Sequence, residues 1–315
     1  MKDATGRNIE YLRLSLTERC NLKCAYCRAA EGECPKDKEL TAEDFLRIVR
    51  CMASLGVKKV RLTGGEPTVR KDLVEIVRGI AATEGITEIA MTTNAQLLEK
   101  LAQPLKEAGL TRVNVSIDSL KAERYREITG GGELENVLRG VDAAIAAGLV
   151  PIKLNAVLMR GKNDDEIDDL IALAKDRPID MRFIELMPMG KEDHTSERIP
   201  TDEIVAARPY LEPLEPRYVG QPSSDYKIEG YVGRVGFISP ISHKFCGDCN
   251  RVRVMSDGML RPCLGVNREV SLKETLEISD SALLETIREA IWNKPEHHEF
   301  SEEFKPAKDM SRIGG

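Results

Sequence analysis

The stretch "LRLSLTERCNLKCAYC" (residues 12–27) joins an apolar run to three closely spaced cysteines. The run at 12–17 predicts a buried strand. Cys20, Cys24 and Cys27 follow it with the spacing C-x3-C-x2-C. Three thiolates on a four-iron cluster leave one iron without a protein ligand, and an open metal position is typical of a catalyst rather than of a structural site. The pattern therefore favours a catalytic cluster on the loop after the first strand.

Cys34 leaves two other interpretations of this motif open. It could complete a structural zinc site, and "CP" at 34–35 is similar to the end of a ferredoxin cysteine run. The gaps between the four cysteines here are three, two and six residues. Ferredoxin gaps are about two, two and three residues, so the spacing argues against an electron-carrier site.

Apolar runs recur along the first part of the chain, with helical spacing between them. We expect further buried strands at 60–65, 89–94, 113–118, 152–159 and 181–188. A helix is expected between Thr41, which opens a capping-box pattern, and Gly56. Other helices are expected at 71–85, 96–109, 133–148 and 164–175. This alternation predicts parallel βα units in an α/β fold.

Polar residues gather at the carboxyl ends of these strands, where the active sites of α/β barrels lie. They are Thr63, Thr92, Asn94, Ser116, Asp118 and Glu185. Their position favours an incomplete barrel, although the alternation alone also fits an open doubly wound sheet.

The pattern changes after about residue 190. Residues 208–225 are rich in proline and predict irregular structure, residues 231–263 predict short strands, and residues 270–293 predict one or two helices. The tail at 304–315 is expected to have no structure of its own. We therefore expect a first domain at residues 1–225 and a smaller C-terminal region at residues 226–315.

A second cysteine triad lies in this C-terminal region. Cys246, Cys249 and Cys263 have the spacing C-x2-C-x13-C, and His243 precedes them. From spacing alone, a structural Cys3His zinc site is an alternative to a second iron–sulfur cluster.

Composition limits the classes of partner. The net charge of −6 gives no general attraction to nucleic acid or to an anionic membrane. The N-terminus has no apolar stretch typical of a signal peptide, and no run is long enough to span a membrane. We therefore expect a cytoplasmic protein without nucleic-acid or membrane partners, whose eight cysteines serve metals or catalysis rather than disulfides. Cys51 is expected in core packing, and Cys34 matches no motif.

Several motifs carry a resemblance that covers nearly the whole chain. "LRLSLTERCNLKCAYC", "RLTGGEP", "TTN", "NVSID", "RFIELMPMG", "CGDCNRVRV" and the terminal "GG" occur in this order. The first motif, with Tyr26 before its last cysteine, resembles the radical S-adenosylmethionine (SAM) superfamily. Together the motifs resemble the GTP 3′,8-cyclase family, whose members begin molybdenum cofactor biosynthesis.

The resemblance implies the fold, the cofactors and the reaction. The implied fold is an incomplete (β/α)6 barrel of radical SAM type with a smaller C-terminal domain that carries a second iron–sulfur site. The implied cofactors are two [4Fe-4S] clusters, one on each triad, and S-adenosyl-L-methionine. In the implied reaction a 5′-deoxyadenosyl radical removes the hydrogen at C3′ of GTP. C3′ then attacks guanine C8, and 3′,8-cyclo-7,8-dihydro-GTP forms.

The resemblance also implies partners. The product would pass to a cyclic pyranopterin monophosphate synthase, and an electron donor such as flavodoxin or ferredoxin would reduce the enzyme. The sequence leaves a homodimer open.

Site residues follow from the same resemblance, motif by motif. Expected SAM contacts are Tyr26, Gly65, Ser116 and Met187. Expected GTP contacts are Arg13, Arg61, Thr92, Lys153, Arg251 and Arg253. Expected catalytic residues are Arg182, Arg251, Arg253, Gly314 and Gly315. Taken singly, each basic residue could be a surface charge and the Gly-Gly end a frayed terminus.

Two other functions stay open from sequence. One is a radical SAM maturase that modifies a peptide and carries an auxiliary cluster. The other is a non-catalytic iron–sulfur carrier, which would need neither SAM contacts nor a cationic pocket.

Overall fold

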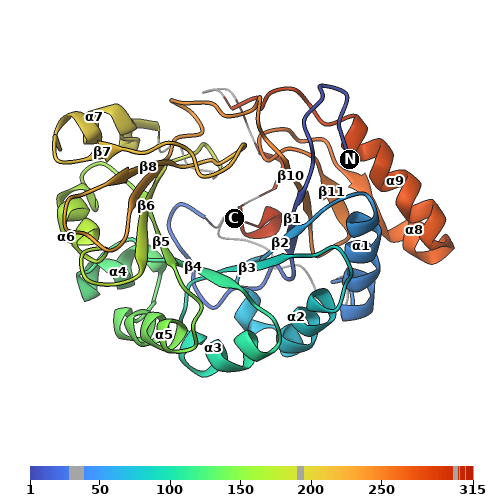
Figure 1. The fold of residues 1–315 in the computed structure, drawn as a ribbon, viewed down its shortest axis with the longest axis horizontal. Helices are drawn as coiled ribbons and strands as arrows, with labels where there is room; N and C mark the ends of the chain where they lie inside the picture. Colours follow the sequence, from blue (N-terminus) through green and yellow to red (C-terminus); the bar gives the residue numbers. More distant parts are fainter. Residues whose placement is uncertain (28–38, 190–194, 301–303, 305, 309, 315) are drawn as a thin grey trace.

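The structure is a computed structural model that describes residues 1–27, 39–189, 195–300, 304, 306–308 and 310–314. Its strands curve around a central space, and helices cover the outside (Figure 1). Cys34, the alternative fourth ligand, and Gly315, the last residue of the predicted tail, lie outside the described residues.

In the described part of the chain, the centre of the sheet is a run of parallel strands in sequence order. They are β1 (Tyr11–Ser15), β2 (Lys59–Thr63), β3 (Glu88–Thr93), β4 (Arg112–Ser116), β5 (Ile152–Leu158) and β6 (Ile179–Glu185). Each strand expected from the sequence is confirmed. An open doubly wound sheet reverses its strand order and carries helices on both faces. The order from β1 to β6 runs in one direction with helices outside, so the predicted incomplete barrel is confirmed (Figure 1).

Helices connect these strands. They are α1 (Ala42–Ser54), α2 (Leu73–Ala81), α3 (Leu98–Glu107), α4 (Ala122–Thr129), α5 (Leu134–Ala146) and α6 (Ile167–Ala172). The predicted capping box of α1 is present, since the Thr41 hydroxyl accepts from the Asp44 amide at 3.2 Å and the Asp44 carboxylate accepts from the Thr41 amide at 3.0 Å. The sequence analysis missed α4, a short and mostly polar helix that buries little besides Tyr125 and Ile128.

Alternation along the strands separates the core from the inside of the barrel. On β1, Leu12 and Leu14 are fully buried in the apolar core, and Arg13 between them has the opposite orientation. Arg13 pairs with Arg61 on β2, so the same inner face continues from strand to strand. The sheet therefore presents polar side chains to the enclosed space and apolar side chains to the helices.

Strands from the C-terminal part extend both edges of this sheet. β9 (Val235–Ile238) pairs in parallel with β6, and β10 (Arg251–Val254) pairs in parallel with β1. β8 (Ser224–Lys227) and β7 (Glu212–Pro213) continue one edge, and β11 (Met259–Arg261) and β12 (Val270–Ser271) continue the other. β8 crosses the expected boundary between residues 225 and 226, and the division into domains there stays a prediction.

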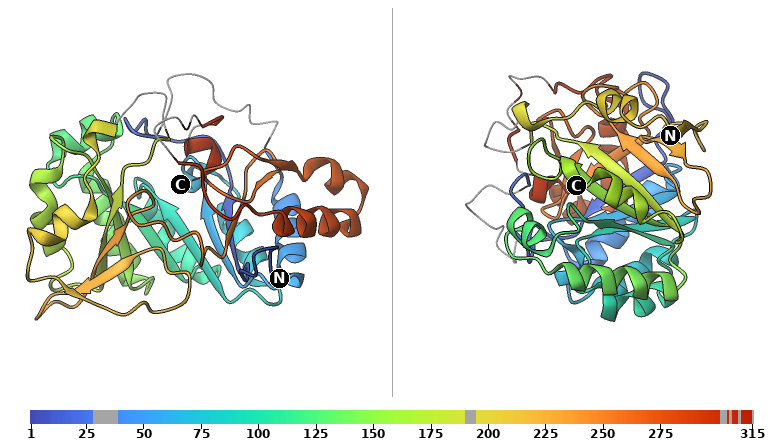
Figure 2. Two further views of the ribbon diagram at one scale, coloured as in Figure 1. Left: turned by 90° about the horizontal axis from the view of Figure 1, so that it is seen from above. Right: turned by 90° about the vertical axis from the view of Figure 1, so that its left-hand side faces the viewer.

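Three more helices complete the outer layer. They are α7 (Thr201–Ala206), α8 (Lys273–Ile278) and α9 (Asp280–Trp292). α8 and α9 lie beside α1 at one end of the molecule (Figure 2), where the Arg47 guanidinium donates to Asp280 at 2.7 Å. They confirm the helices expected at 270–293. Among the described residues, no helix has both the length and the apolar character needed to cross a bilayer.

Within the described residues, the tail forms one helical turn that the sequence did not predict, and contacts with other segments hold it. α10 (Met310–Ile313) ends close to the centre of the barrel (Figure 1). Ile313 is buried in a small apolar cluster with Met255 and Phe300, and Arg312 pairs with Glu18 at 3.3 Å. A helix of one turn is not stable alone, so these tertiary contacts hold it.

Candidate active site

The barrel encloses a cavity of about 330 Å³, and both cysteine triads line it. Cys20, Cys24 and Cys27 lie on the loop after β1. Cys246 and Cys249 lie just before β10, and Cys263 follows β11. Because β10 pairs with β1, two motifs that are far apart in the sequence meet at one cavity.

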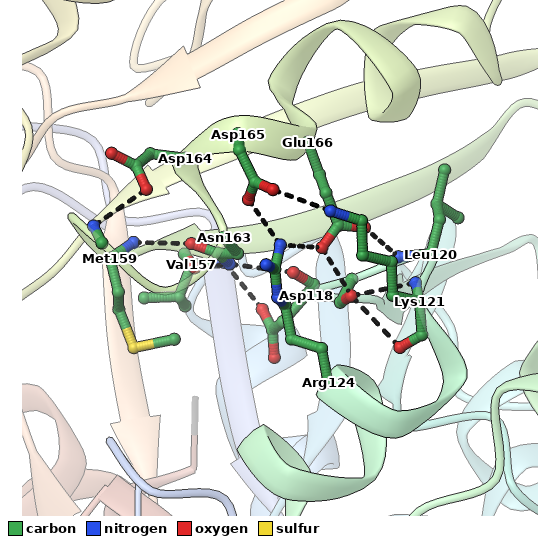
Figure 3. A network of polar contacts seen from close by, with 12 residues as sticks. Asp118, Leu120, Lys121, Arg124, Val157, Met159, Asn163, Asp164, Asp165 and Glu166 are labelled. Carbon is green, nitrogen blue, oxygen red and sulfur yellow. Dashed lines mark hydrogen bonds and ion pairs between the residues drawn. The ribbon is translucent and has the colours of Figure 1, made fainter.

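Tyr26 in the first cysteine loop is fixed by Asp118, which follows β4. Its hydroxyl donates to Asp118 Oδ2 at 2.8 Å. Asp118 Oδ1 accepts from the Val157 amide on β5 at 2.8 Å, and the Asn163 side chain donates to the Asp118 carbonyl oxygen at 2.8 Å (Figure 3). Burial raises the pKa of Asp118 to about 6, against the effect of the hydrogen bonds from Val157 and Tyr26. The loop is thus tied to β4 and β5.

The thiols of the first triad are crowded. Burial raises the pKa of Cys24 well above its usual value, and Cys27, Asp118 and Cys20 raise it further. Metal binding favours the thiolate form because the ion supplies the opposing positive charge. A bound metal cluster would therefore be needed to stabilise these three residues as thiolates.

Gly64 and Gly65 let the loop after β2 approach the cysteine loop. A Cβ at Gly65 would lie 2.3 Å from the Arg19 carbonyl oxygen, and one at Gly64 would lie 2.5 Å from the Thr17 carbonyl oxygen. The Gly65 amide donates to the Thr17 oxygen at 2.7 Å, and the Glu66 amide donates to the Arg19 oxygen at 2.8 Å. Gly65 is an expected SAM contact, and the structure adds that both glycines allow the close packing of two loops.

The second triad lies among cations. Burial alone would raise the pKa of Cys249, but Arg251 and Lys294 lower it to about 6. Lys294 is 4% exposed and donates to the Pro262 carbonyl oxygen at 2.6 Å. The Cys249 thiol is thereby biased toward the thiolate that a metal ligand requires.

The zinc alternative with His243 has no support in this geometry. The His243 ring is exposed and lies 2.9 Å from Asp202 Oδ1. Within the described residues, no three His, Cys, Asp or Glu side chains are grouped for a single metal ion. Cysteines on an iron–sulfur cluster each bind a different iron and so lie further apart. His243 is therefore not placed as a fourth ligand of this triad, and a second iron–sulfur cluster there stays a prediction.

The basic residues predicted as GTP contacts or catalytic residues come from several strands. They are Arg13 on β1, Arg61 on β2, Lys153 on β5, Arg182 on β6, and Arg251 and Arg253 on β10. Burial lowers the pKa of Lys153 to about 6, and Arg182, Arg112 and Arg61 contribute to this shift. Burial and Arg251 likewise lower the pKa of Arg253 to about 10. These cations repel one another, so a polyanionic ligand would stabilise them.

Several buried polar atoms at the cavity have no hydrogen-bond partner in the described chain. They are Tyr11 Oη, Arg13 Nε, Arg61 Nε, Thr63 Oγ1, Arg182 Nε, Arg251 Nη2, Asn155 Oδ1 and both amide atoms of Asn114. Buried polar groups are rarely left unpaired. The set, which is mostly donors, therefore points to a ligand that is rich in acceptor atoms.

Gly314 of the tail is buried beside the ends of β1 and β2. Its carbonyl oxygen accepts a hydrogen bond from Arg253 Nη1. A Cβ at this position would lie 2.5 Å from Thr63 Oγ1 and 3.0 Å from Ser15 Cβ, and φ is +82°. Both space and backbone conformation therefore require glycine here.

The structure brings most of the predicted site residues to one cavity. Its lining includes Arg13, Tyr26, Arg61, Gly65, Thr92, Ser116, Arg182, Met187, Arg251, Arg253 and the six predicted cysteine ligands. Lys153 is 5% exposed and lies outside this lining, close to Arg182. Cys51 is buried in the apolar core. What each site residue does stays a prediction.

The sequence analysis missed part of the lining. The missed residues include Tyr11, Asn114, Asn155, Tyr218, Phe245 and Lys294. Strand periodicity could have found Tyr11, Asn114 and Asn155, because each lies two positions from a predicted contact on its own strand. Phe245 and Lys294 come from connecting segments and carry no such signal.

Two family models match the chain. Residues 14–174 match the Radical SAM superfamily, and residues 179–300 match Molybdenum Cofactor Synthesis C. The first match contains the first triad, and the second match contains the second triad.

Curated relatives match over their full length. A GTP 3′,8-cyclase of Alkaliphilus oremlandii (strain OhILAs) is 48% identical over 100% of both chains. One of Clostridium botulinum (strain Langeland) is 45% identical with the same coverage. One of Listeria monocytogenes serovar 1/2a is 43% identical over 100% of this chain and 99% of its own.

Solved structures match at lower identity. Streptococcus suis SuiB bound to S-adenosylmethionine is 18% identical with a TM-score of 0.59, covering 91% of this chain and 67% of SuiB. Methylornithine synthase (PylB) is 17% identical with a TM-score of 0.51, covering 64% of this chain and 62% of its own. At this identity the likeness concerns the fold alone. The precursor peptide bound to SuiB in a related structure therefore says nothing about the substrate here.

Proposed function

The chain belongs to the GTP 3′,8-cyclase family of radical SAM enzymes, and we propose from this premise that its two cysteine triads act on one GTP in their shared cavity. The reaction converts GTP to 3′,8-cyclo-7,8-dihydro-GTP and is the first step of molybdenum cofactor synthesis. The observation that carries the proposal is that both triads and most of the predicted basic contacts line the same cavity.

The first triad fits the cofactors of the superfamily. A [4Fe-4S] cluster with SAM supplies a 5′-deoxyadenosyl radical when both are bound. Cys20, Cys24 and Cys27 would hold the cluster. SAM is assigned to residues that line the cavity with this triad, namely Tyr26, Gly65, Ser116 and Met187.

A second [4Fe-4S] cluster is assigned to Cys246, Cys249 and Cys263. Three ligands leave one iron open, and the guanine of GTP is its proposed occupant. Arg251 and Lys294 favour thiolate at Cys249, which supports a cluster rather than free thiols.

GTP is assigned to the buried cations. Arginine forks suit phosphate oxygens, and the unpartnered Nε atoms of Arg13, Arg61 and Arg182 are donors without acceptors in the described chain. The proposed GTP contacts are Arg13, Arg61, Thr92, Lys153, Arg251 and Arg253. Arg182, Arg251, Arg253, Gly314 and Gly315 are proposed to act in catalysis.

The contribution of the chain itself is orientation. Cations on one side and the second triad on the other would hold the triphosphate and the base, so that C3′ and C8 approach each other in a reactive geometry. The Gly314 carbonyl group, held by Arg253, would keep that arginine in place. Enclosure within the barrel would limit access of water to a reactive intermediate.

Several further assignments stay predictions. They are a cyclic pyranopterin monophosphate synthase that takes the product, flavodoxin or ferredoxin as electron donor, a cytoplasmic location and a homodimer.

Metal counting and product analysis on anaerobically reconstituted protein test the proposal together. Wild type should hold about eight irons, and alanine at all three cysteines of either triad should leave roughly half. Both triple variants should fail to make the cyclised nucleotide, while the control Cys51→Ala should keep iron and activity. Stoichiometric zinc at the second triad, or a product that contains no nucleotide, would contradict the assignment.

A further inference from the structure

Asn114 lies inside the barrel between two predicted GTP contacts. It pairs with Thr92 on β3 and with Lys153 on β5. Its neighbours Val113 and Val115 are fully buried in the apolar core on the opposite face of β4. The Asn114 side chain therefore points inward, and it lines the cavity.

The amide of Asn114 is buried without partners. The residue is 1% exposed, and neither Nδ2 nor Oδ1 has a hydrogen-bond partner in the described chain. Burying an unpaired amide opposes folding. A position of this kind is expected where a ligand completes the hydrogen bonds.

Asn163 shows what a structural asparagine looks like in the same barrel. It is also fully buried, but its Nδ2 donates to the carbonyl oxygens of Asp118 and Val157 at 2.8 and 2.9 Å, and its Oδ1 accepts from the Met159 amide at 2.8 Å (Figure 3). The amide of Asn163 is used to fix loops. The amide of Asn114 has no such partners among the described residues and is available to a ligand bound in the cavity.

Hydrogen-bond chemistry limits what that group can be. Nδ2 can only donate and Oδ1 can only accept, so full pairing requires a ligand group that both accepts and donates. Ionised phosphate oxygens only accept. The ribose hydroxyls both accept and donate, and so does the edge of guanine. The second triad, where the guanine is proposed to bind, comes from β10 and β11, at the opposite end of the run β10-β1-β2-β3-β4.

We propose that Asn114 binds a ribose hydroxyl of the nucleotide, and so discriminates against the deoxy analogue that lacks this hydroxyl and positions the sugar between the two triads. The inference rests on the proposed function, because it takes GTP as the occupant of the cavity. Ser116, two residues along the same face, is one of the four predicted SAM contacts. A sugar held by Asn114 would therefore lie next to the SAM side.

Competition binding of GTP, 2′-deoxy-GTP and 3′-deoxy-GTP to the reconstituted protein tests this assignment. Wild type should bind GTP about tenfold more tightly than the analogue that lacks the recognised hydroxyl, the factor given by one ordinary hydrogen bond. Asn114→Leu, which has similar volume and no polar atoms, should bind GTP and that analogue equally. Asn136→Leu, on the partly exposed face of α5, is the matched control and should keep the wild-type preference.

Three results would overturn the inference while leaving the proposed function intact. Wild type could bind both analogues as tightly as GTP. Asn114→Leu could keep the wild-type preference. The Asn114→Leu variant could lose affinity for SAM rather than for GTP, which would assign the Asn114 amide to the ribose of SAM.

Asn114→Asp covers the case in which the leucine variant loses its clusters. It keeps the shape and the acceptor oxygens, so it should still prefer the hydroxyl while binding all three triphosphates more weakly through charge repulsion. Equal binding of the three would overturn the inference. Failure of wild type to bind any guanine nucleotide would instead overturn the proposed function.

Discussion

We expect GTP binding to depend on pH through Lys153, and the structure gives the size of the effect. Burial lowers its pKa to about 6, the neighbouring cations Arg182, Arg112 and Arg61 lower it as well, and Asp180 acts in the opposite direction. Without substrate this lysine is therefore mostly neutral above about pH 7. A bound triphosphate adds negative charge nearby and raises the pKa, so the complex takes up a proton.

The size of this pH effect on GTP affinity follows from the difference between the assay pH and the pKa of Lys153 in the protein without GTP. At about pH 7.5, some 1.5 units above that pKa, binding should take up nearly one proton. Protonation then costs about 2 kcal/mol of the binding free energy. The affinity for GTP should fall by up to about tenfold per pH unit above the pKa of the free lysine, and level off below it.

Calorimetric titration in two buffers of different ionisation enthalpy measures the proton uptake directly. Lys153→Arg keeps a permanent charge and should bind GTP without this uptake, and Lys153→Met should bind weakly and also without it. Protons exchanged by the γ-phosphate itself are common to all three proteins and cancel in the comparison. Equal uptake by wild type and Lys153→Arg would refute the reasoning.

Three other predictions concern single contacts. Arg251→Ala should weaken GTP binding by roughly 1.5–3 kcal/mol without loss of either cluster, and unchanged affinity would contradict its assignment as a GTP contact. Deleting the last two residues should leave the melting temperature and iron content unchanged while cyclisation falls by orders of magnitude, because Gly314 contacts Arg253; product at the normal rate would mean a dispensable tail. Gly65→Ala should release iron from the first triad, since its Cβ would lie 2.3 Å from a carbonyl oxygen, whereas Gly247→Ala, with no atom within 4 Å, should not affect iron at the second triad.

The strands and most of the lining of the cavity could be predicted because the alternation of apolar and polar residues along each strand shows which side chains face the core. The apolar residues beside Arg13 and Arg61 identify the core face, and the alternate positions must then face inward. The sequence motifs predicted the remaining parts of the site, namely two cysteine triads and a glycine loop at strand ends.

Features that depend on contacts between segments far apart in the sequence could not be predicted from the sequence. α10 is too short to form alone, and it is held by Ile313 among residues from other segments. α4 was missed because it buries few apolar side chains. The proximity of Lys294 to the second triad follows from the packing of the segment after α9, and local sequence carries no record of that packing.

The unpaired amide of Asn114 could not have been found from sequence either. Its place on the inner face of β4 follows from periodicity, but whether a neighbour pairs with it depends on side chains from β3 and β5. Asn163 has the same side chain, but its amide is fully paired because the surrounding backbone supplies the hydrogen-bond partners.

Isotope transfer from the substrate tests whether one GTP lies between both triads with C3′ presented to the SAM side. Reconstituted, reduced protein would be given SAM and GTP that carries deuterium at C3′, and the recovered 5′-deoxyadenosine would be weighed by mass spectrometry. The account predicts one deuterium in 5′-deoxyadenosine together with the cyclised nucleotide, and no transfer when the label is at C2′. Deuterium-free 5′-deoxyadenosine from C3′-labelled GTP, with SAM cleaved at the usual rate, would contradict it.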